Sequence, residues 1–232
     1  MDRIQLKELT KKQLKGKWKM PVLLTLAYLV ISIIASIFQE EANSFVTTVI
    51  MFLVVWGIST WATVGISNFY LEFLKKDGKV EFRDVLVSKN KVLKSLGFTA
   101  IVGIISFILV FIVTSVTTFI IMSVILSYNS INIGTIIAII LTILLLIVYI
   151  IFTYMVTQTP YIIIEKENIG IIEAMKLSAK IMKGNKWKYF VFQLSFIGWA
   201  ILSIITFGIG FLWLIPYVTL ASTNFYKNLN KE

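Results

Sequence analysis

Six long apolar segments recur along this chain and constrain its fold more than any other feature. Most are long enough for a helix to cross the roughly 30 Å hydrocarbon core of a bilayer, which takes about 20 residues. Lys188, at the start of the fifth segment, is their only charged residue. The segments are residues 20–38, 45–71, 96–126, 133–164, 187–206 and 211–226. With 58% hydrophobic residues, against about 45–50% in soluble domains, the chain is predicted to be an all-α integral membrane protein with six transmembrane helices.

The basic residues fall on one side of this pattern. All 22 Lys and Arg residues lie in four regions: residues 1–19, 72–95, 165–188 and the tail from Lys227. The alternating connections, 39–44, 127–132 and 207–210, contain none. Because basic loops stay in the cytoplasm, both termini are predicted to be cytoplasmic.

Two central segments are longer than a bilayer requires. Residues 96–126 would span about 46 Å as a helix, so this helix is expected to tilt, break or protrude. Its weak point is predicted at Thr114–Thr118, because β-branched and hydroxylated residues are poor helix formers. In segment 133–164, Pro160 predicts a kink or a helix end.

Short motifs recur at the cytoplasmic ends of the first and last helix pairs. Before the first and fifth segments, Lys-Gly precedes a Trp-Lys pair, with Gly16 and Trp18 matching Gly184 and Trp187. After the second and sixth segments, Asn-Phe-Tyr recurs, with Asn68 and Tyr70 matching Asn224 and Tyr226. The single membrane domain, 1–232, is therefore predicted to be a parallel pseudo-repeat of three hairpins, in units of about 1–76, 77–166 and 167–232. The middle unit lacks the motifs and is an inference.

Each unit is expected to begin with an amphipathic cytoplasmic helix at the membrane interface. Residues 169–183 fit best, with apolar side chains on one side and lysines elsewhere. Lys176, Lys180 and Lys183 are predicted to contact anionic lipid headgroups. The alternative is that these helices only attach the bundle to the bilayer.

The residue types present restrict the chemistry. Without Cys or His, thiolate and imidazole catalysis and the usual zinc or haem ligands are excluded, and no cofactor or metal is expected. Asp77, Glu81 and Asp84 are interpreted as a solvated face, although their convergence on a metal would favour an enzyme. The net charge of +10 lies beside the apolar segments, which predicts the lipid bilayer, not nucleic acid, as its partner.

The chain resembles a known family, the domain-of-unknown-function family numbered 975, over nearly its whole length and most strongly from Glu173 to Tyr226. The resemblance rests on Ala174–Ser178, Met182–Trp187, Leu194–Trp199, Thr206–Gly210 and Ile215–Tyr217. Its motif residues are Gly184, Asn185, Trp187, Ser195, Gly198, Trp199, Gly208, Gly210, Pro216 and Tyr217. The resemblance implies a multi-pass protein of a bacterial plasma membrane, with no established activity and no catalytic residues to assign.

Three functions follow as hypotheses. The first is a non-enzymatic envelope or accessory protein with a membrane-protein or peptide partner, including self-protection against a membrane-active peptide. The second is transport of uncharged or lipid substrates, since the segments lack the internal charged pairs of ion-coupled carriers. The third, least favoured, is a lipid-directed enzyme.

Overall fold

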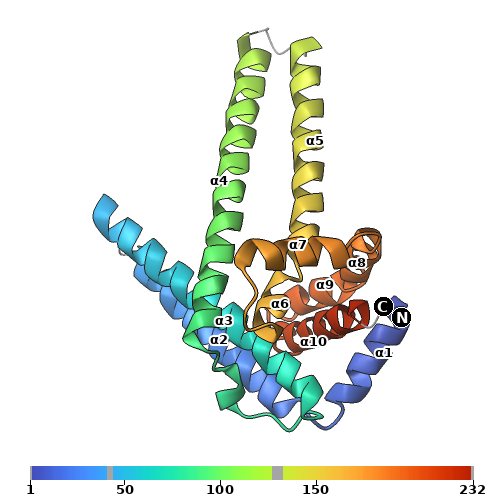
Figure 1. Cartoon of the computed structure of the whole chain (residues 1–232). Helices are drawn as coiled ribbons and strands as arrows, with labels where there is room; N and C mark the ends of the chain where they lie inside the picture. Colours follow the sequence, from blue (N-terminus) through green and yellow to red (C-terminus); the bar gives the residue numbers. More distant parts are fainter. Residues whose placement is uncertain (1, 41–43, 127–132, 231–232) are drawn as a thin grey trace.

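The described part of the chain consists of helices and their connections (Figure 1). The computed structural model describes residues 2–40, 44–126 and 133–230, so most of the predicted outer connections 39–44 and 127–132 lie outside the described residues. The elements are α1 (Arg3–Leu14), α2 (Lys19–Glu40), α3 (Phe45–Lys75), η1 (Phe82–Val85), α4 (Lys89–Leu126), α5 (Ile133–Val156), α6 (Thr159–Glu165), α7 (Ile171–Ile181), α8 (Lys186–Leu194), α9 (Ile197–Ile205) and α10 (Phe211–Leu229).

Five helical segments in these described ranges are long and apolar enough to cross a membrane. They are Lys19–Ile37, Phe45–Lys75, Lys89–Leu126, Ile133–Glu165 and Lys186–Ile205. The sixth predicted span corresponds to α10, which is not among the five. Its second half carries polar residues such as Asn224 and Lys227, which lower its apolar character. The chain is therefore a membrane protein by the composition of five segments, and the sixth span stays a prediction.

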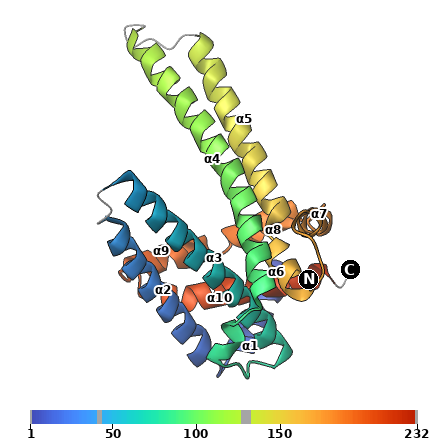
Figure 2. The ribbon, with the colours of Figure 1, turned by 60° about the vertical axis from the view of Figure 1, so that its left-hand side comes forward.

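The buried core gathers at one end of the hairpins, in a region we call the hub. The hub comprises α1, η1, α6, α7 and the adjoining ends of α3, α5 and α10. Leu14, Phe69, Ile163 and Leu220 are fully buried there. Both views show α2–α3 and α4–α5 leaving the hub as separate hairpins (Figures 1 and 2).

Many large apolar side chains on the projecting part of the α4–α5 hairpin are exposed. Phe107 and Phe111 on α4 are 73% and 64% exposed. Such surfaces are unfavourable in water but not against lipid tails. Their position on the projecting hairpin suits a membrane environment.

Helix α4 is continuous through the predicted weak point at Thr114–Thr118, so of the three expected outcomes the break does not occur there. The hydroxyls of Thr114, Ser115, Thr117 and Thr118 each donate to the carbonyl oxygen four residues earlier, at 2.8–2.9 Å. These bonds satisfy the polar side chains within the helix. The helix is about 57 Å long at 1.5 Å per residue, so length beyond the bilayer is accommodated by tilt or protrusion.

Unlike α4, two of the predicted spans are interrupted. Segment 133–164 breaks between Val156 and Thr159, and Pro160 lies in the first turn of α6, as its fixed φ and missing N–H favour. Segment 187–206 breaks at Ser195 and Phe196 into α8 and α9, which its continuous hydropathy did not predict. The expected helix at 169–183 is present as α7, whereas the middle unit begins with the single turn η1.

Candidate functional site

The repeated glycines end two helices in the same way. Gly16 follows α1 with φ +75°, and Gly184 follows α7 with φ +79°, a region that favours glycine. In each turn the amide after the glycine donates to a carbonyl three residues earlier, Lys17 to Leu14 and Asn185 to Met182. The repeat therefore encodes a turn that leads into the next helix, near Trp18 and Trp187.

The repeated asparagines attach short segments at the hub to long helices. Asn224 on α10 donates to Thr10 Oγ1 at 3.0 Å and Gln13 Oε1 at 2.7 Å, both on α1. Asn68 on α3 donates to the carbonyl oxygen of Asp84 in η1 at 2.8 Å. Both motif positions thus have the same role, which is to hold a connecting segment.

The tyrosines of the two motifs are buried in the hub. Tyr70 packs edge-on against Phe69, with ring centroids 5.3 Å apart. Tyr226 stacks on Tyr161 at 5.0 Å and donates to Glu165 Oε2 at 2.8 Å. Lys227 also pairs with Glu165. These contacts make both tyrosines structural residues.

A lysine on α1 contacts the α8–α9 break at Ser195 and Phe196. Lys7 Nζ donates to the Ser195 carbonyl oxygen at 2.8 Å and lies 4.4 Å from the centre of the Phe196 ring. Burial, with the nearby charges of Lys11 and Arg3, lowers the pKa of Lys7. Arg3, Lys7 and Lys11 are spaced four residues apart, so they share one face of α1. Sequence reasoning missed this basic face, although its spacing is visible.

The remaining motif residues shape the α9–α10 hairpin. Gly208 has φ +87° in the turn, and a side chain at Gly210 would meet Ser203 within 2.9 Å. Pro216 lies inside α10, and the Tyr217 hydroxyl donates to the Lys7 carbonyl oxygen at 3.4 Å. Nothing lies within 4 Å of a side chain added at Gly198, and Trp199 is 51% exposed.

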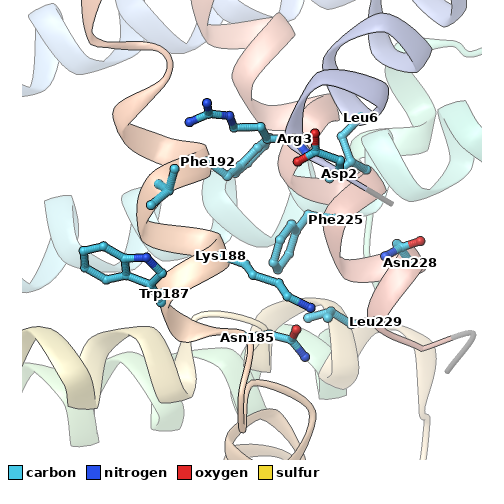
Figure 3. A pocket seen from close by; sticks show the side chains of 11 residues that line it. Asp2, Arg3, Leu6, Asn185, Trp187, Lys188, Phe192, Phe225, Asn228 and Leu229 are labelled. Atoms are coloured by element: carbon cyan, nitrogen blue, oxygen red, sulfur yellow. The ribbon is translucent and has the colours of Figure 1, made fainter.

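A recess of about 690 Å³ lies between α1, α8 and α10 (Figure 3). It contains the motif residues Asn185 and Trp187 together with the cations Arg3 and Lys188. Figure 3 shows the Arg3 guanidinium pointing away from the Lys188 ammonium, so the two do not form one anion clamp. The Asp2 carboxylate caps α1 by accepting from the Arg3 amide at 2.6 Å. The lining of this recess combines polar and charged side chains with the apolar Leu6, Phe192 and Phe225.

A second recess, of about 530 Å³, contains two of the three lysines predicted to contact headgroups. Lys176 and Lys180 on α7 line it together with Lys166 and Glu173. Lys183 lies beyond the end of α7 and is not part of the lining. Ser178 fixes the opposite face of α7 by donating to the Met155 carbonyl oxygen at 2.6 Å. The structure thus places Lys166 beside two of the predicted lysines. The helical spacing of α7 did not reveal Lys166, because this residue lies in a separate turn before α7.

The motifs and their geometry agree with a family assignment over the whole chain. Residues 1–232 match the family described as "Protein of unknown function (DUF975)". The chain belongs to this family. No curated protein and no solved structure matches the chain. The DUF975 description provides no activity, so function must be argued from the recesses themselves.

The three acidic side chains singled out in the sequence of this DUF975 protein each pair with a cation and do not converge. Asp77 pairs with Lys17 at 2.8 Å and Asp84 with Lys76 at 2.5 Å, while Glu81 pairs with Arg83 at 3.0 Å. The hydrogen bond from Lys17 lowers the pKa of Asp77. Within the described ranges, no group of three or more acidic, His or Cys side chains could hold a metal ion.

Proposed function

We propose that this DUF975 protein is a non-enzymatic accessory component of a bacterial cell envelope. In this proposal it spans the plasma membrane six times, keeps both termini in the cytoplasm and binds anionic lipid headgroups there. The observation that carries the proposal is the recess lined by Lys166, Lys176 and Lys180. Lysines beside an apolar surface are the side chains that attract anionic headgroups, at about 1 kcal/mol each.

The orientation of α7 supports a position at the membrane interface. Both views show α7 running across the direction of α4 and α5 (Figures 1 and 2). A helix across the bilayer normal, with lysines on its outer side, lies where interfacial helices lie. Its inner side packs on α5 and α6, so the lysines face away from the protein core.

The packing of the short cytoplasmic segments supports three repeated units. Each segment packs on the second helix of the preceding unit: η1 on α3, α7 on α5 and α6, and α1 on α10. The last of these contacts closes the series into a ring. A ring of equivalent contacts is expected if three hairpins enter from the same side of the membrane.

Cysteine labelling tests the six spans, because the chain has no Cys of its own. We expect an impermeant maleimide to label Ser44→Cys and Ile209→Cys in intact cells. Lys79→Cys and Lys183→Cys should react only after permeabilisation. Labelling of Ile209→Cys only in permeabilised cells would contradict both crossings of the last hairpin, since the α9–α10 turn would then lie on the cytoplasmic side.

Headgroup binding is tested with purified protein and phosphatidylglycerol, by native mass spectrometry. The double variant Lys176→Gln, Lys180→Gln should bind roughly 30-fold more weakly, from about 2 kcal/mol of lost attraction. Lys183→Gln is the matched control, because this lysine is outside the recess, and it should bind as the parent does. Equal losses in both variants, or none in the double variant, would contradict a specific site.

The self-protection version of the accessory role predicts a cellular effect. Deleting the gene should increase killing by a membrane-active peptide, and overexpression should reduce it. Unchanged killing in both strains would remove self-protection and leave the general accessory role.

A further inference from the structure

A mainly apolar groove lies between α1, the α1–α2 connection and the α9–α10 hairpin. Its volume is about 360 Å³, within the range of small-molecule sites. Three of the chain's six tryptophans, Trp18, Trp199 and Trp213, line it. Its only charged lining residue is Lys11.

The charged and apolar parts of the groove lie at different depths. Tyr217 marks the α1 end, because its hydroxyl donates to the Lys7 carbonyl oxygen. Gly210, seven residues earlier and immediately before α10, marks the hairpin end, about 10 Å away along the helix direction. Helix α9 belongs to a segment apolar enough to cross a membrane. The groove therefore leads from a cationic rim toward the apolar hairpin turn.

Lys11 is available to an external anion. It is exposed, and within the described part of the chain it forms no ion pair. Arg3 and Lys7 continue the positive charge along the same face of α1. A ligand that suits this site has an anionic group next to an extended apolar chain.

We propose that this groove binds one acyl chain of an anionic phospholipid from the inner leaflet, with its phosphate next to Lys11. The proposal rests on the cytoplasmic position of α1 in the proposed function, but not on the α7 recess. The indole ring of Trp18, next to α1, suits the boundary between headgroups and chains, where one side is apolar and the other is wet. Trp199 and Trp213 line the more apolar part of the groove, toward the hairpin turn.

Quenching of tryptophan fluorescence by brominated lipids tests this directly. The variant Trp56→Phe, Trp61→Phe, Trp187→Phe retains only the three groove tryptophans. It is reconstituted in phosphatidylcholine–phosphatidylglycerol vesicles in which one lipid or the other carries dibrominated chains at equal mole fraction. We expect stronger quenching by brominated phosphatidylglycerol, because bound lipid holds bromine against the indoles.

Two lysines on the same turn provide the matched comparison. Lys11→Gln should reduce the preference for phosphatidylglycerol about fivefold, whereas Lys12→Gln, outside the groove lining, should leave it unchanged. Equal quenching by the two brominated lipids, or equal effects of the two substitutions, would overturn the proposal. Lys176→Gln with Lys180→Gln should leave this quenching unchanged, so the groove and the headgroup recess can fail separately.

Discussion

Replacing Asn224 should loosen α1 without releasing it. The side-chain amide of Asn224 makes two good hydrogen bonds to α1, at 3.0 Å to Thr10 and 2.7 Å to Gln13. Each is worth about 1 kcal/mol net. In Asn224→Leu, Thr10 keeps its bond to the Leu6 carbonyl oxygen at 2.7 Å, so little further penalty is expected. The opening free energy of α1 should fall by about 2 kcal/mol.

Helix α1 should stay docked because its apolar contacts remain. Leu6 and Leu14 are 1% and 0% exposed, and each fully buried leucine contributes about 1.5–3 kcal/mol. Amide hydrogen exchange in nanodiscs, followed by mass spectrometry of peptides, measures the opening. A loss of about 2 kcal/mol corresponds to roughly 30-fold faster exchange of the α1 amides.

The other copy of the motif provides the reciprocal control. Asn68 makes one bond, to Asp84, so Asn68→Leu should accelerate exchange about fivefold around η1 and leave α1 unchanged. Equal acceleration of both regions by either variant would refute equivalent local roles for the two asparagines. Unchanged exchange of α1 in Asn224→Leu would refute the assigned hydrogen bonds.

Three further predictions concern individual contacts. Gly210→Ala should destabilise the protein by about 1–3 kcal/mol, because the added Cβ would collide with Ser203. Gly57→Ala is the control and should stabilise the protein slightly, because nothing lies within 4 Å of a Cβ there. Thermal unfolding in nanodiscs measures both changes, and the same sign for both would contradict this prediction. Ser178→Ala should lower the free energy of unfolding by about 1–3 kcal/mol in the same assay, because the buried main-chain amide of Gln158 loses its acceptor, the Ser178 hydroxyl. Ser36→Ala, on an exposed helix face, should be nearly neutral. Because its pKa is lowered, Asp77 stabilises the 76–81 connection fully above its ordinary pKa of 3.8, and this is lost as pH falls through the lowered value. A spin label at Lys79→Cys should therefore become more mobile in acid, and Asp77→Asn should abolish that pH dependence; a dependence that persists would refute the assignment.

Hydropathy and charge predicted the coarse architecture because both act over whole segments. Five of the six predicted spans recur as segments able to cross a membrane, since a helix in lipid needs only sufficient apolar length. Local polarity was less informative. The hydroxyls within Thr114–Thr118 predicted a weak point, at which a break was one of three expected outcomes. Each hydroxyl bonds instead to the backbone of its own helix, which a propensity measured in water does not represent.

The α8–α9 break could not be predicted because its cause lies far away in the sequence. Ending α8 at Leu194 leaves carbonyl groups without partners in the helix. Lys7, 188 residues earlier in the sequence, donates a hydrogen bond to the carbonyl oxygen of Ser195. No pattern within residues 187–206 contains that information.

The family motif of the last third becomes intelligible as the surface that receives α1. Ser195, Tyr217 and Asn224 bond to α1 directly. Asn185 and Trp187 share a recess with Arg3, and Trp199 and Gly210 share the lipid groove with Lys11. A motif that seemed to describe one hairpin thus describes the joint between the two ends of the chain. Because both the recess of Figure 3 and the groove open at that joint, anything bound there would also bear on how firmly α1 packs against α10.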